Sequence, residues 1–285
     1  MSALTVYSRM IKLSHSIFAL PFALASGLLA ARQVDVTVVQ WALIVACMVT
    51  ARSSAMGFNR IVDRDHDARN PRTAGREIPS GQIGVSAAWA FTLGSAVLFV
   101  AASAALGPTT LALAPVALAV TWGYSLTKRF TALCHLILGL GLSLAPVGAY
   151  IAVTGQFHPS VIILGAGVLT WVSGFDIIYA LQDEQFDREH RLHSIPAFLG
   201  KDRALYVSSF LHLLSAACIA VFVYLIGGTY LSWGAVAFFV AMLIYQHLLV
   251  KPNDLSKVNL AFFTTNGVAA VVFAGLVISE LLLSA

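Results

Sequence analysis

Long apolar runs follow one another along almost the whole chain, and short polar segments separate them. The runs are continuous and do not alternate between apolar and polar residues, which favours helices over the strands of a membrane β-barrel. A helix needs about 20 apolar residues to cross the hydrocarbon core of a bilayer. The pattern therefore predicts nine transmembrane helices, at residues 16–31, 37–57, 86–106, 109–126, 132–153, 160–181, 204–226, 230–250 and 260–284.

The composition leads to the same class of protein. Apolar types make up 59% of the 285 residues and charged types only 11%, whereas about a quarter of a soluble domain is charged. A soluble fold of this length cannot hide that much apolar surface from water. We predict an all-α, polytopic membrane protein, with a single transmembrane domain over residues 1–285 and the lipid bilayer as its surroundings.

The basic residues indicate which way the helices face. Nearly all of the 17 Lys and Arg residues precede the first apolar run or follow the second, fourth, sixth and eighth runs. The positive-inside rule places these segments and the N-terminus in the cytoplasm, and nine spans then put the C-terminus outside. A formal charge of +4 distributed in this way forms no basic face, so we expect no nucleic-acid partner.

The acidic residues gather in two clusters that match each other. One lies at the cytoplasmic end of the second run and the other at the cytoplasmic end of the sixth, and an offset of 120 residues superposes them. The matched positions are Asn59, Asp63 and Asp67 and, in the same order, Tyr179, Asp183 and Asp187. This correspondence suggests two halves of similar helical layout.

The spacing of four residues brings the carboxylates of each cluster together. Four residues turn a helix by about 400° and rise about 6 Å, so Asp63 and Asp67 share one face, as do Asp183 and Asp187. Carboxylates this close at the edge of a bilayer repel each other and are costly to desolvate unless a cation lies between them. Mg²⁺ takes oxygen ligands and is usually shared with phosphates, which makes it the natural candidate.

Basic groups lie on the same predicted side. Tyr124, Lys128 and Arg129 close the fourth run, and Arg72 and Arg76 follow the first acidic cluster. Lys and Arg neutralise phosphate oxygens while carboxylates hold the bridging metal, so the whole set suits a diphosphate. Simpler alternatives stay open: the basic pair as ordinary orientation charges, and each acidic cluster as a solvated helix end paired with neighbouring arginines.

These motifs resemble those of the UbiA superfamily of intramembrane aromatic prenyltransferases. The signature N-x-x-x-D-x-x-x-D matches residues 59–67, and D-x-x-Y-A-x-x-D-x-x-x-D matches residues 176–187. Y-x-x-x-K-R matches residues 124–129, and R-T-A-x-R-x-x-P-S-G matches residues 72–81. The resemblance covers nearly the whole chain, including the count of nine helices. It implies a helix bundle around a central cavity that opens to the cytoplasm, in a bacterial inner membrane.

Within the superfamily the chain is most similar to the 4-hydroxybenzoate polyprenyltransferase branch. The resemblance implies that a polyprenyl group passes from polyprenyl diphosphate to an aromatic acid, 4-hydroxybenzoate in the first place, in quinone biosynthesis. Residues 11–22 and 174–179 look instead like a bacterial sub-branch, some of whose members belong to menaquinone synthesis. The alternative acceptor is therefore 1,4-dihydroxy-6-naphthoate.

The resemblance also implies a role for each motif residue. Mg²⁺ held by the cluster aspartates clamps the diphosphate, and tyrosine rings or hydroxyls stabilise the allylic cation or the phosphate. Asp176 lies two helical turns before Asp183 and removes the ring proton, unless it is a buried acid paired with Asn or Arg. The implied metal ligands, which are also catalytic, are Asp63, Asp67, Asp183 and Asp187. The implied substrate-binding residues are Asn59, Tyr124, Lys128, Arg129, Tyr179, Arg72, Lys12 and His15.

The acceptor carboxylate and the prenyl tail need partners as well. Lys12, Arg9 and Arg72 are the candidates for the carboxylate. His15 and His193 are either catalytic or ordinary hydrogen-bonded histidines at helix ends. Small residues of the fifth run either let helices pack closely or leave a groove for the tail; they are Gly139, Gly141, Ser143, Ala145 and Gly148.

Two other classes of protein stay open. A proton-coupled transporter also carries intramembrane acids, but near the midplane and in inverted repeats. Here the acids gather at one membrane face, and the repeat runs in parallel because both clusters follow helices that exit to the same side. A non-catalytic assembly factor has no need for four aspartates in register.

Overall fold

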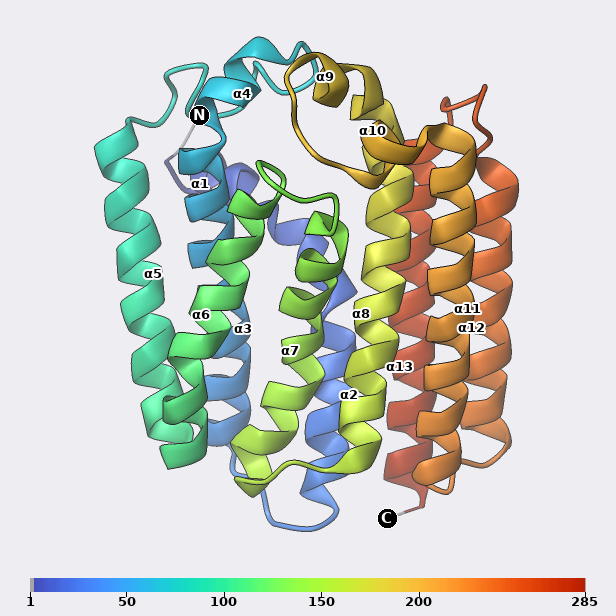
Figure 1. Cartoon of the computed structure of the whole chain (residues 1–285). Helices are drawn as coiled ribbons and strands as arrows, with labels where there is room; N and C mark the ends of the chain where they lie inside the picture. Colours follow the sequence, from blue (N-terminus) through green and yellow to red (C-terminus); the bar gives the residue numbers. More distant parts are fainter. Residues whose placement is uncertain (1–2, 285) are drawn as a thin grey trace.

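The computed structural model describes residues 3–284, which form a bundle of long helices lying side by side (Figure 1). Among these residues, extended pairing is limited to one isolated bridge between Lys251 and Asp254, which confirms the predicted all-α class. The long helices are α2 (Leu20–Ala31), α3 (Val38–Val62), α5 (Val85–Leu106), α6 (Pro108–Thr127), α7 (Cys134–Thr154), α8 (Pro159–Ala180), α11 (Lys201–Leu225), α12 (Tyr230–Leu249) and α13 (Asn266–Leu283), the last preceded by a π-helical turn, Leu260–Thr265.

Short helices cover one end of the bundle. They are α1 (Ala3–Met10), a 3₁₀ turn (Leu13–Phe18), α4 (Arg64–Arg69), a second 3₁₀ turn (Leu181–Asp183), α9 (Glu184–Glu189) and α10 (Ile195–Leu199). The loops that carry most of the Lys and Arg residues emerge at this same end, which we call the basic end (Figure 1). The last turn of α13 lies at the opposite end of the bundle (Figure 1).

Each predicted apolar run coincides with one helix to within a few residues, but the count of nine membrane spans is not confirmed. Eight helices in the described part of the chain are long and apolar enough to cross a membrane, whereas α2 has only 12 residues. Pro21 lies in the first turn of α2, where its missing N–H costs no helical hydrogen bond, and a 3₁₀ turn precedes it. The first predicted span is therefore divided into two short helical segments.

The offset that relates the acidic clusters also relates the helices around them. The short helix α4 covers residues 64–69 and α9 covers residues 184–189, so their bounds differ by 120 at both ends. The chain leaves helical geometry at the matched aspartates, with φ −91° and ψ 0° at Asp63 and φ −101° and ψ 1° at Asp183. The two halves thus share the same order of elements: a long helix, a break at the aspartate and a short helix.

The break adds a detail to the prediction that the two aspartates of each cluster share one helical face. The spacing of four residues still applies to the first pair, since the Asp67 backbone N–H donates to the Asp63 carbonyl at 2.8 Å. However, Asp63 and Asp183 lie at breaks in the helix and precede α4 and α9, without a side-chain capping bond to either short helix. Asp63, Asp67 and Asp183 line one polar cavity, and Asp187 lies beside it.

The interior is filled differently on the two sides of α7. Around α8, buried aromatic rings form the largest core cluster, which includes Phe22, Trp171, Phe175, Phe239 and Phe273. The Trp171 indole N–H donates to Asn266 Oδ1 at 3.0 Å, which satisfies the polar edge of that ring. Between α3, α6 and α7, by contrast, the side chains leave an apolar cavity.

The small residues of α7 lie in two different kinds of surroundings. A Cβ on Gly139 would collide with the Leu169 carbonyl of α8, so Gly139 allows these two helices to pack closely. A Cβ on Gly148 would meet open space. Gly148 lines the apolar cavity together with Gly141 and Ala145. One face of α7 therefore packs against α8, and another face forms part of the cavity wall.

Candidate active site

A polar cavity of about 240 Å³ lies at the basic end, where α3, α6, α7 and α8 begin or end. Both acidic clusters contribute to it, one from each half of the chain. The predicted site residues that line it are Asn59, Asp63, Asp67, Arg72, Tyr124, Lys128, Arg129, Asp176, Tyr179 and Asp183. The structure thus brings together side chains that are more than 100 residues apart in sequence.

An amide and two arginines hold the first acidic cluster. Asn59 Nδ2 donates to Asp63 Oδ2 at 2.9 Å, and Arg76 Nη1 donates to both oxygens of Asp67 at 2.7 and 2.8 Å. Arg129 Nη2 lies farther away, 3.8 Å from Asp63 Oδ1. Burial and then the nearby Asp67 charge raise the pKa of Asp63 from 3.8 to about 6. Of this cluster, Asp63 has the greater need of a further cation.

Arg72, from the first half, holds Asp183 of the second. Its Nε donates to Asp183 Oδ1 at 2.9 Å and its Nη2 donates to Oδ2, which makes a bidentate pair. Asn70 Nδ2 donates to the same Oδ1 at 3.1 Å, and Arg72 Nη1 donates to the Tyr179 hydroxyl at 3.1 Å. The segment after α4 therefore reaches across the cavity and connects the two acidic clusters.

Asp187 is the most buried of the four aspartates and lies beside the cavity. Its side chain has no exposed surface, Lys128 Nζ lies 2.8 Å from its Oδ1, and Ser194 Oγ donates to its Oδ2 at 2.8 Å. Burial by itself lowers the pKa of Lys128, but the Asp187 charge outweighs it and the pKa is raised. Lys128 therefore keeps its charge in this buried pair.

These contacts exclude the simpler alternative for the first cluster. Arg64 pairs with Asp65 on the surface at 3.5 Å, and the acid paired with buried Arg60 is Glu77, at 4.0 Å. Asp63 is thus not the partner of either neighbouring arginine. The two basic residues at the end of α6 contact acids of the site, so they do more than orient the chain.

The donor set fits a hard divalent cation in chemical type. Carboxylates and an amide oxygen from two sides of one cavity are the ligands that Mg²⁺ prefers. Among residues 3–284, however, no three His, Cys, Asp or Glu side chains converge closely enough to hold an ion by themselves. Carboxylates of this set would therefore supply only part of the shell of a bound Mg²⁺, an ion that usually keeps several waters and binds substrate phosphates as well.

Lys12 and Arg52 form a separate basic group, in which Arg52 lines the apolar cavity together with Tyr124, whereas Lys12 lines neither cavity. Within the described chain neither is paired with an acid, and the buried Arg52 Nε has no hydrogen-bond partner. Arg52 Nη2 donates to the Lys12 carbonyl at 3.1 Å, and Lys12 itself adopts a left-handed conformation with φ 46°. Burial and then the Arg60 charge lower the pKa of Lys12 to about 8. This excess of positive charge suits an anionic ligand.

The other candidates from the sequence lie at different places. Arg9 donates to an exposed glutamine side chain at 2.7 Å, and His193 is exposed, with its backbone N–H donating to the Lys128 carbonyl. The His15 ring packs against three phenylalanine rings. Burial and then the Lys12 charge lower the pKa of His15 to about 3, so the ring is neutral and offers a phosphate no charge.

Asp176 lines the polar cavity and has a partner that sequence reasoning missed. His135 Nδ1 lies 2.7 Å from Asp176 Oδ2, so the expected pairing with Asn or Arg is wrong. The two residues lie on different helices, and no spacing rule relates them. The sequence analysis did not propose Arg52 as a site residue. A charged residue inside an apolar run often marks a functional site, and Arg52 lies two turns before Asn59 on the same helix, so the sequence did contain a signal for it.

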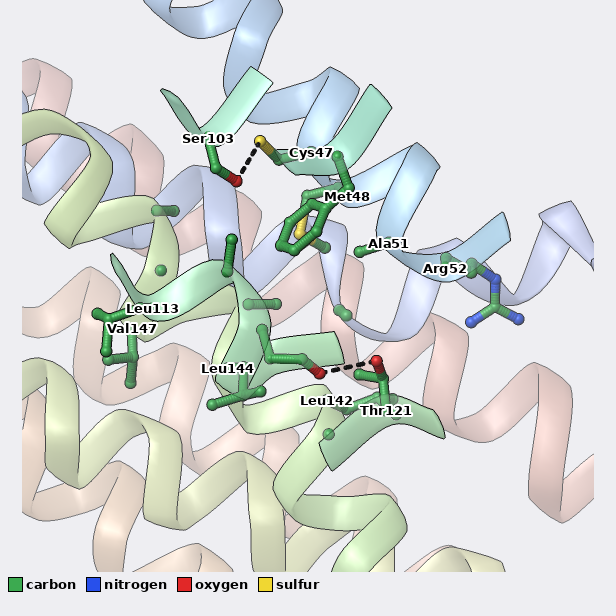
Figure 2. A pocket seen from close by; sticks show the side chains of 18 of the residues that line it. Cys47, Met48, Ala51, Arg52, Ser103, Leu113, Thr121, Leu142, Leu144 and Val147 are labelled. Atoms are coloured by element: carbon green, nitrogen blue, oxygen red, sulfur yellow. Dashed lines mark hydrogen bonds between the residues drawn. The ribbon is translucent and has the colours of Figure 1, made fainter. Parts of the chain in front are cut away.

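Figure 2 shows part of an apolar cavity of about 310 Å³. It adjoins the polar cavity, because Tyr124 and Leu138 line both. Its wall is largely apolar and includes Met48, Leu113 and Leu144, which are labelled in Figure 2. A charged head site joined to an elongated apolar site suits an amphiphile with an anionic head and a hydrocarbon tail.

Comparison with known proteins agrees with this description. The sequence model of the UbiA prenyltransferase family matches residues 19–268. The 4-hydroxybenzoate octaprenyltransferase of Tolumonas auensis is 27% identical over 228 residues, which are 80% of this chain and 79% of that protein. The protein of the same name from Aeromonas hydrophila is 28% identical over 232 residues, which are 81% of this chain and 80% of that protein.

Solved structures lead to the same family. The apo structure of a UbiA homolog from Aeropyrum pernix K1 has a TM-score of 0.81 at 29% identity, over 95% of this chain and 98% of that chain. The structure of a UbiA homolog from Archaeoglobus fulgidus bound to GPP and Mg²⁺ has a TM-score of 0.74 at 19% identity, over 96% and 99% of the two chains, and shares the fold. Since the family match extends over most of its length, this chain belongs to the UbiA prenyltransferase family.

Proposed function

We propose that this chain transfers a polyprenyl group from polyprenyl diphosphate to the ring of an aromatic acid, 4-hydroxybenzoate in the first place, in quinone biosynthesis. One observation carries the proposal: a cavity lined by carboxylates of both halves and by several Lys and Arg residues meets an apolar cavity at Tyr124 and Leu138. That combination matches a diphosphate with a long hydrocarbon tail. The relatives named 4-hydroxybenzoate octaprenyltransferase support the aromatic acid as acceptor.

The diphosphate would lie between the two acidic clusters. The four cluster aspartates would hold Mg²⁺, with Asn59 orienting Asp63, and the GPP and Mg²⁺ in the Archaeoglobus fulgidus homolog support this placement. Bound there, Mg²⁺ supplies Lewis-acid neutralisation of the leaving diphosphate. Arg72 and Lys128 now pair with Asp183 and Asp187. With the substrate bound, their charges would turn to phosphate oxygens.

The prenyl tail would extend from Tyr124 into the apolar cavity. The carbon–oxygen bond next to the diphosphate breaks to give an allylic cation, which water would destroy. The aliphatic wall of the cavity keeps water away from it. Tyr124 and Tyr179 line the polar cavity at this junction, and their ring faces would stabilise the positive charge.

The acceptor carboxylate would be bound by Lys12 and Arg52. Both carry charges that no acid of the described chain pairs with, and Arg52 lines the apolar cavity together with Tyr124. A carboxylate there would accept charge-assisted hydrogen bonds, including one from the buried Arg52 Nε. This binding would hold the aromatic ring near Tyr124, where the head and tail sites meet.

The transfer then needs one new bond and one proton removal. The electron pair of the broken carbon–oxygen bond leaves with the diphosphate, and a ring carbon beside the phenolic hydroxyl bonds to the allylic carbon. The proton on that ring carbon passes to Asp176, and the electron pair of its bond restores aromaticity. Asp176 has the access that this step requires, because it lines the cavity and its side chain is 23% exposed.

An assay with two acceptors tests the proposal. Purified protein would receive geranyl diphosphate and Mg²⁺ with either 4-hydroxybenzoate or 1,4-dihydroxy-6-naphthoate, and products would be identified by mass. We expect prenylated 4-hydroxybenzoate as the faster product. Both acceptors carry a carboxylate for Lys12 and Arg52, so faster naphthoate prenylation would support the menaquinone alternative. No prenylated product from either acid, together with potential-driven solute uptake in vesicles, would support the transporter instead.

A further inference from the structure

His135 is a buried histidine to which the proposed transfer gives no role. It is the second residue of α7, and its side chain is only 3% exposed. Both ring nitrogens are engaged: Nδ1 lies 2.7 Å from Asp176 Oδ2, and Nε2 accepts the backbone N–H of Ile195 at 3.3 Å. A ring held at both nitrogens has one orientation.

The two contacts determine where the imidazole proton lies. Nε2 can accept the Ile195 N–H only through its lone pair, so Nε2 carries no proton. The neutral ring then has its proton on Nδ1 and donates it in a hydrogen bond to Asp176 Oδ2. This bond occupies one oxygen of the carboxylate and leaves Oδ1 for the polar cavity, which Asp176 lines.

The turn that fixes His135 also fixes a cluster aspartate. Ile195 is the first residue of α10, and the N-cap residue Ser194 donates its hydroxyl to Asp187 Oδ2 at 2.8 Å. The backbone N–H of His193 donates to the Lys128 carbonyl at 2.7 Å. One short backbone segment, residues 193–195, therefore holds His135 in register with the Lys128–Asp187 pair.

We propose that His135 is a positioning residue for proton removal: its Nδ1–H holds the Asp176 carboxylate so that Oδ1 meets the proton of the attacked ring carbon. The inference rests on the proposed function, in which Asp176 is the base. In this step the ring C–H bond breaks, its electron pair returns to the ring, and the proton goes to Asp176 Oδ1. His135 keeps its own proton throughout; it also lines the polar cavity, but with both nitrogens engaged it offers a substrate no hydrogen bond.

Replacement of His135 by leucine removes the donor and keeps a side chain of similar size. We expect His135→Leu to lower kcat by about 10- to 100-fold, the range expected when a reacting group is misplaced by about 1 Å. The KM for both substrates should change little, since both ring nitrogens of His135 are bound within the protein and leave no donor for a substrate. His135→Asn, whose side-chain amide can still donate to Asp176, should recover most of the lost rate.

A kinetic isotope effect separates positioning from loss of structure. With 4-hydroxybenzoate deuterated at both ring carbons beside the hydroxyl, the wild-type rate should not change, because we expect ionisation of the donor, and not proton removal, to be its slow step. In His135→Leu and Asp176→Asn, proton removal becomes slow and the deuterated acceptor should react more slowly than the normal one. The double variant should lose no more rate than Asp176→Asn alone. His158→Leu removes a helix-capping histidine at the other end of the bundle and serves as the control for loss of structure; transfer by its folded protein should show no isotope effect.

The outcomes distinguish failure of the inference from failure of the proposed function. If the wild type prenylates the acceptor and His135→Leu keeps full kcat, or loses rate with no isotope effect, the positioning role is wrong and the transferase stands. If the wild type forms no prenylated product, the proposed function is wrong. The geometry can then still be read from ¹⁵N-histidine spectra, in which His135 should show a protonated Nδ1 and an unprotonated Nε2; the opposite tautomer would overturn the inference.

Discussion

Lys12 and Arg52 differ from the charged side chains that line the polar cavity. Each of the four cluster aspartates has a cationic partner, whereas these two cations have no acidic partner in the part of the chain that the structure describes. Lys12 is charged at pH 7 and becomes neutral above about pH 8, because burial and neighbouring arginines lower its pKa to that value. Of the residues proposed to bind the acceptor, Lys12 is therefore the one whose charge changes in the mildly alkaline range.

The KM for the acceptor should rise as the pH rises from 7 to 9, as Lys12 loses its charge. Loss of one charged hydrogen bond weakens binding of a carboxylate by about 1.5 kcal/mol, so we expect roughly a tenfold increase. Lys12→Arg keeps its charge over this range, and its KM should stay flat. Steady-state kinetics at several pH values checks this, and an equal rise in Lys12→Arg would show that the acceptor itself titrates and that Lys12 does not bind it.

At the scale of single residues, the repeated acidic motif made part of the site predictable. The four-residue spacing appears in both halves, so Asp63 and Asp183 could be matched from the sequence and do line one cavity. The pairing of Asp176 with His135 could not be predicted, because it arises from the packing of α7 against α8. Local spacing contains no information about a contact between two helices.

At the scale of the elements, the apolar runs predicted the helices well because the thickness of a bilayer fixes their length. They did not predict the breaks at Asp63 and Asp183, since a spacing of four residues is equally compatible with one continuous helix. Each break turns a short helix over the basic end. In consequence, α4 and α9 lie over the ends of the long helices (Figure 1), and Asp63, Asp67 and Asp183 line the polar cavity there.

Gly148 on α7 tests whether the apolar cavity binds the prenyl tail. It lies about 15 Å of helix rise beyond Leu138, where the two cavities meet. Gly148→Leu would fill the far part of the cavity, so transfer from long-chain diphosphates should fall about 10- to 100-fold, corresponding to about 1–3 kcal/mol of overpacking. Transfer from geranyl diphosphate should persist.

A matched substitution controls for the change in helix propensity at Gly148. Gly94 on α5 also has open space around a new Cβ, but it is exposed on the outside of the bundle. Gly94→Leu should leave the rates with long and short donors unchanged. Equal rates of Gly148→Leu and wild type with a long-chain donor would mean that the tail lies elsewhere.

Glu280 on α13 stabilises the start of α12 at the end of the bundle away from the site. Its two carboxylate oxygens accept the backbone N–H groups of Thr229 and Ser232 at 2.6 and 2.8 Å, as a helix-capping side chain does. Glu280→Ala should lower stability by about 1–2 kcal/mol, visible as a lower apparent melting temperature in detergent. Transfer by the folded protein should not change, and Glu189→Ala, on the surface, should melt as the wild type does. An unchanged melting temperature in Glu280→Ala would show that the cap contributes nothing.

At the scale of the whole molecule, two similar halves contribute one acidic cluster each to a shared site. Arg72 and Lys128 of the first half pair with Asp183 and Asp187 of the second, so the ion pairs cross from one half to the other. The aromatic core around α8 is closely packed, and the apolar cavity lies between α3, α6 and α7. Because the two halves repeat in parallel, the charged and polar residues of the site lie at the same end of the bundle.

The orientation of this bundle in the membrane can be tested by fusion of reporters. The loops at the basic end carry most of the Lys and Arg residues, which predicts that this end lies in the cytoplasm. The last turn of α13 lies at the opposite end (Figure 1). A reporter fused after residue 285 should therefore be external, and one fused in the loop 251–257 should be cytoplasmic. A cytoplasmic C-terminal reporter would show that the count of spans or the orientation is wrong.

The sequence predicted the class of fold and the two acidic clusters, whereas the arrangement of the cavity depends on the packed helices. The composition and the length of the apolar runs predict a helical bundle. The repeated acidic motifs predict at which helix ends the site lies. The cations that pair with each aspartate, and the junction of the two cavities at Tyr124 and Leu138, follow only from the fold. They could not be inferred from a pattern along the chain.

The central claim is tested most directly by the rate of prenyl transfer in the wild type, in Asp183→Asn and in the surface control Asp65→Asn. Each protein is assayed with Mg²⁺ and with a chelator. We expect product from the wild type and Asp65→Asn only with Mg²⁺, and a transfer rate at least about 100-fold lower in folded Asp183→Asn. Transfer that persists in chelator, or full activity in Asp183→Asn, would contradict a diphosphate held between the two acidic clusters.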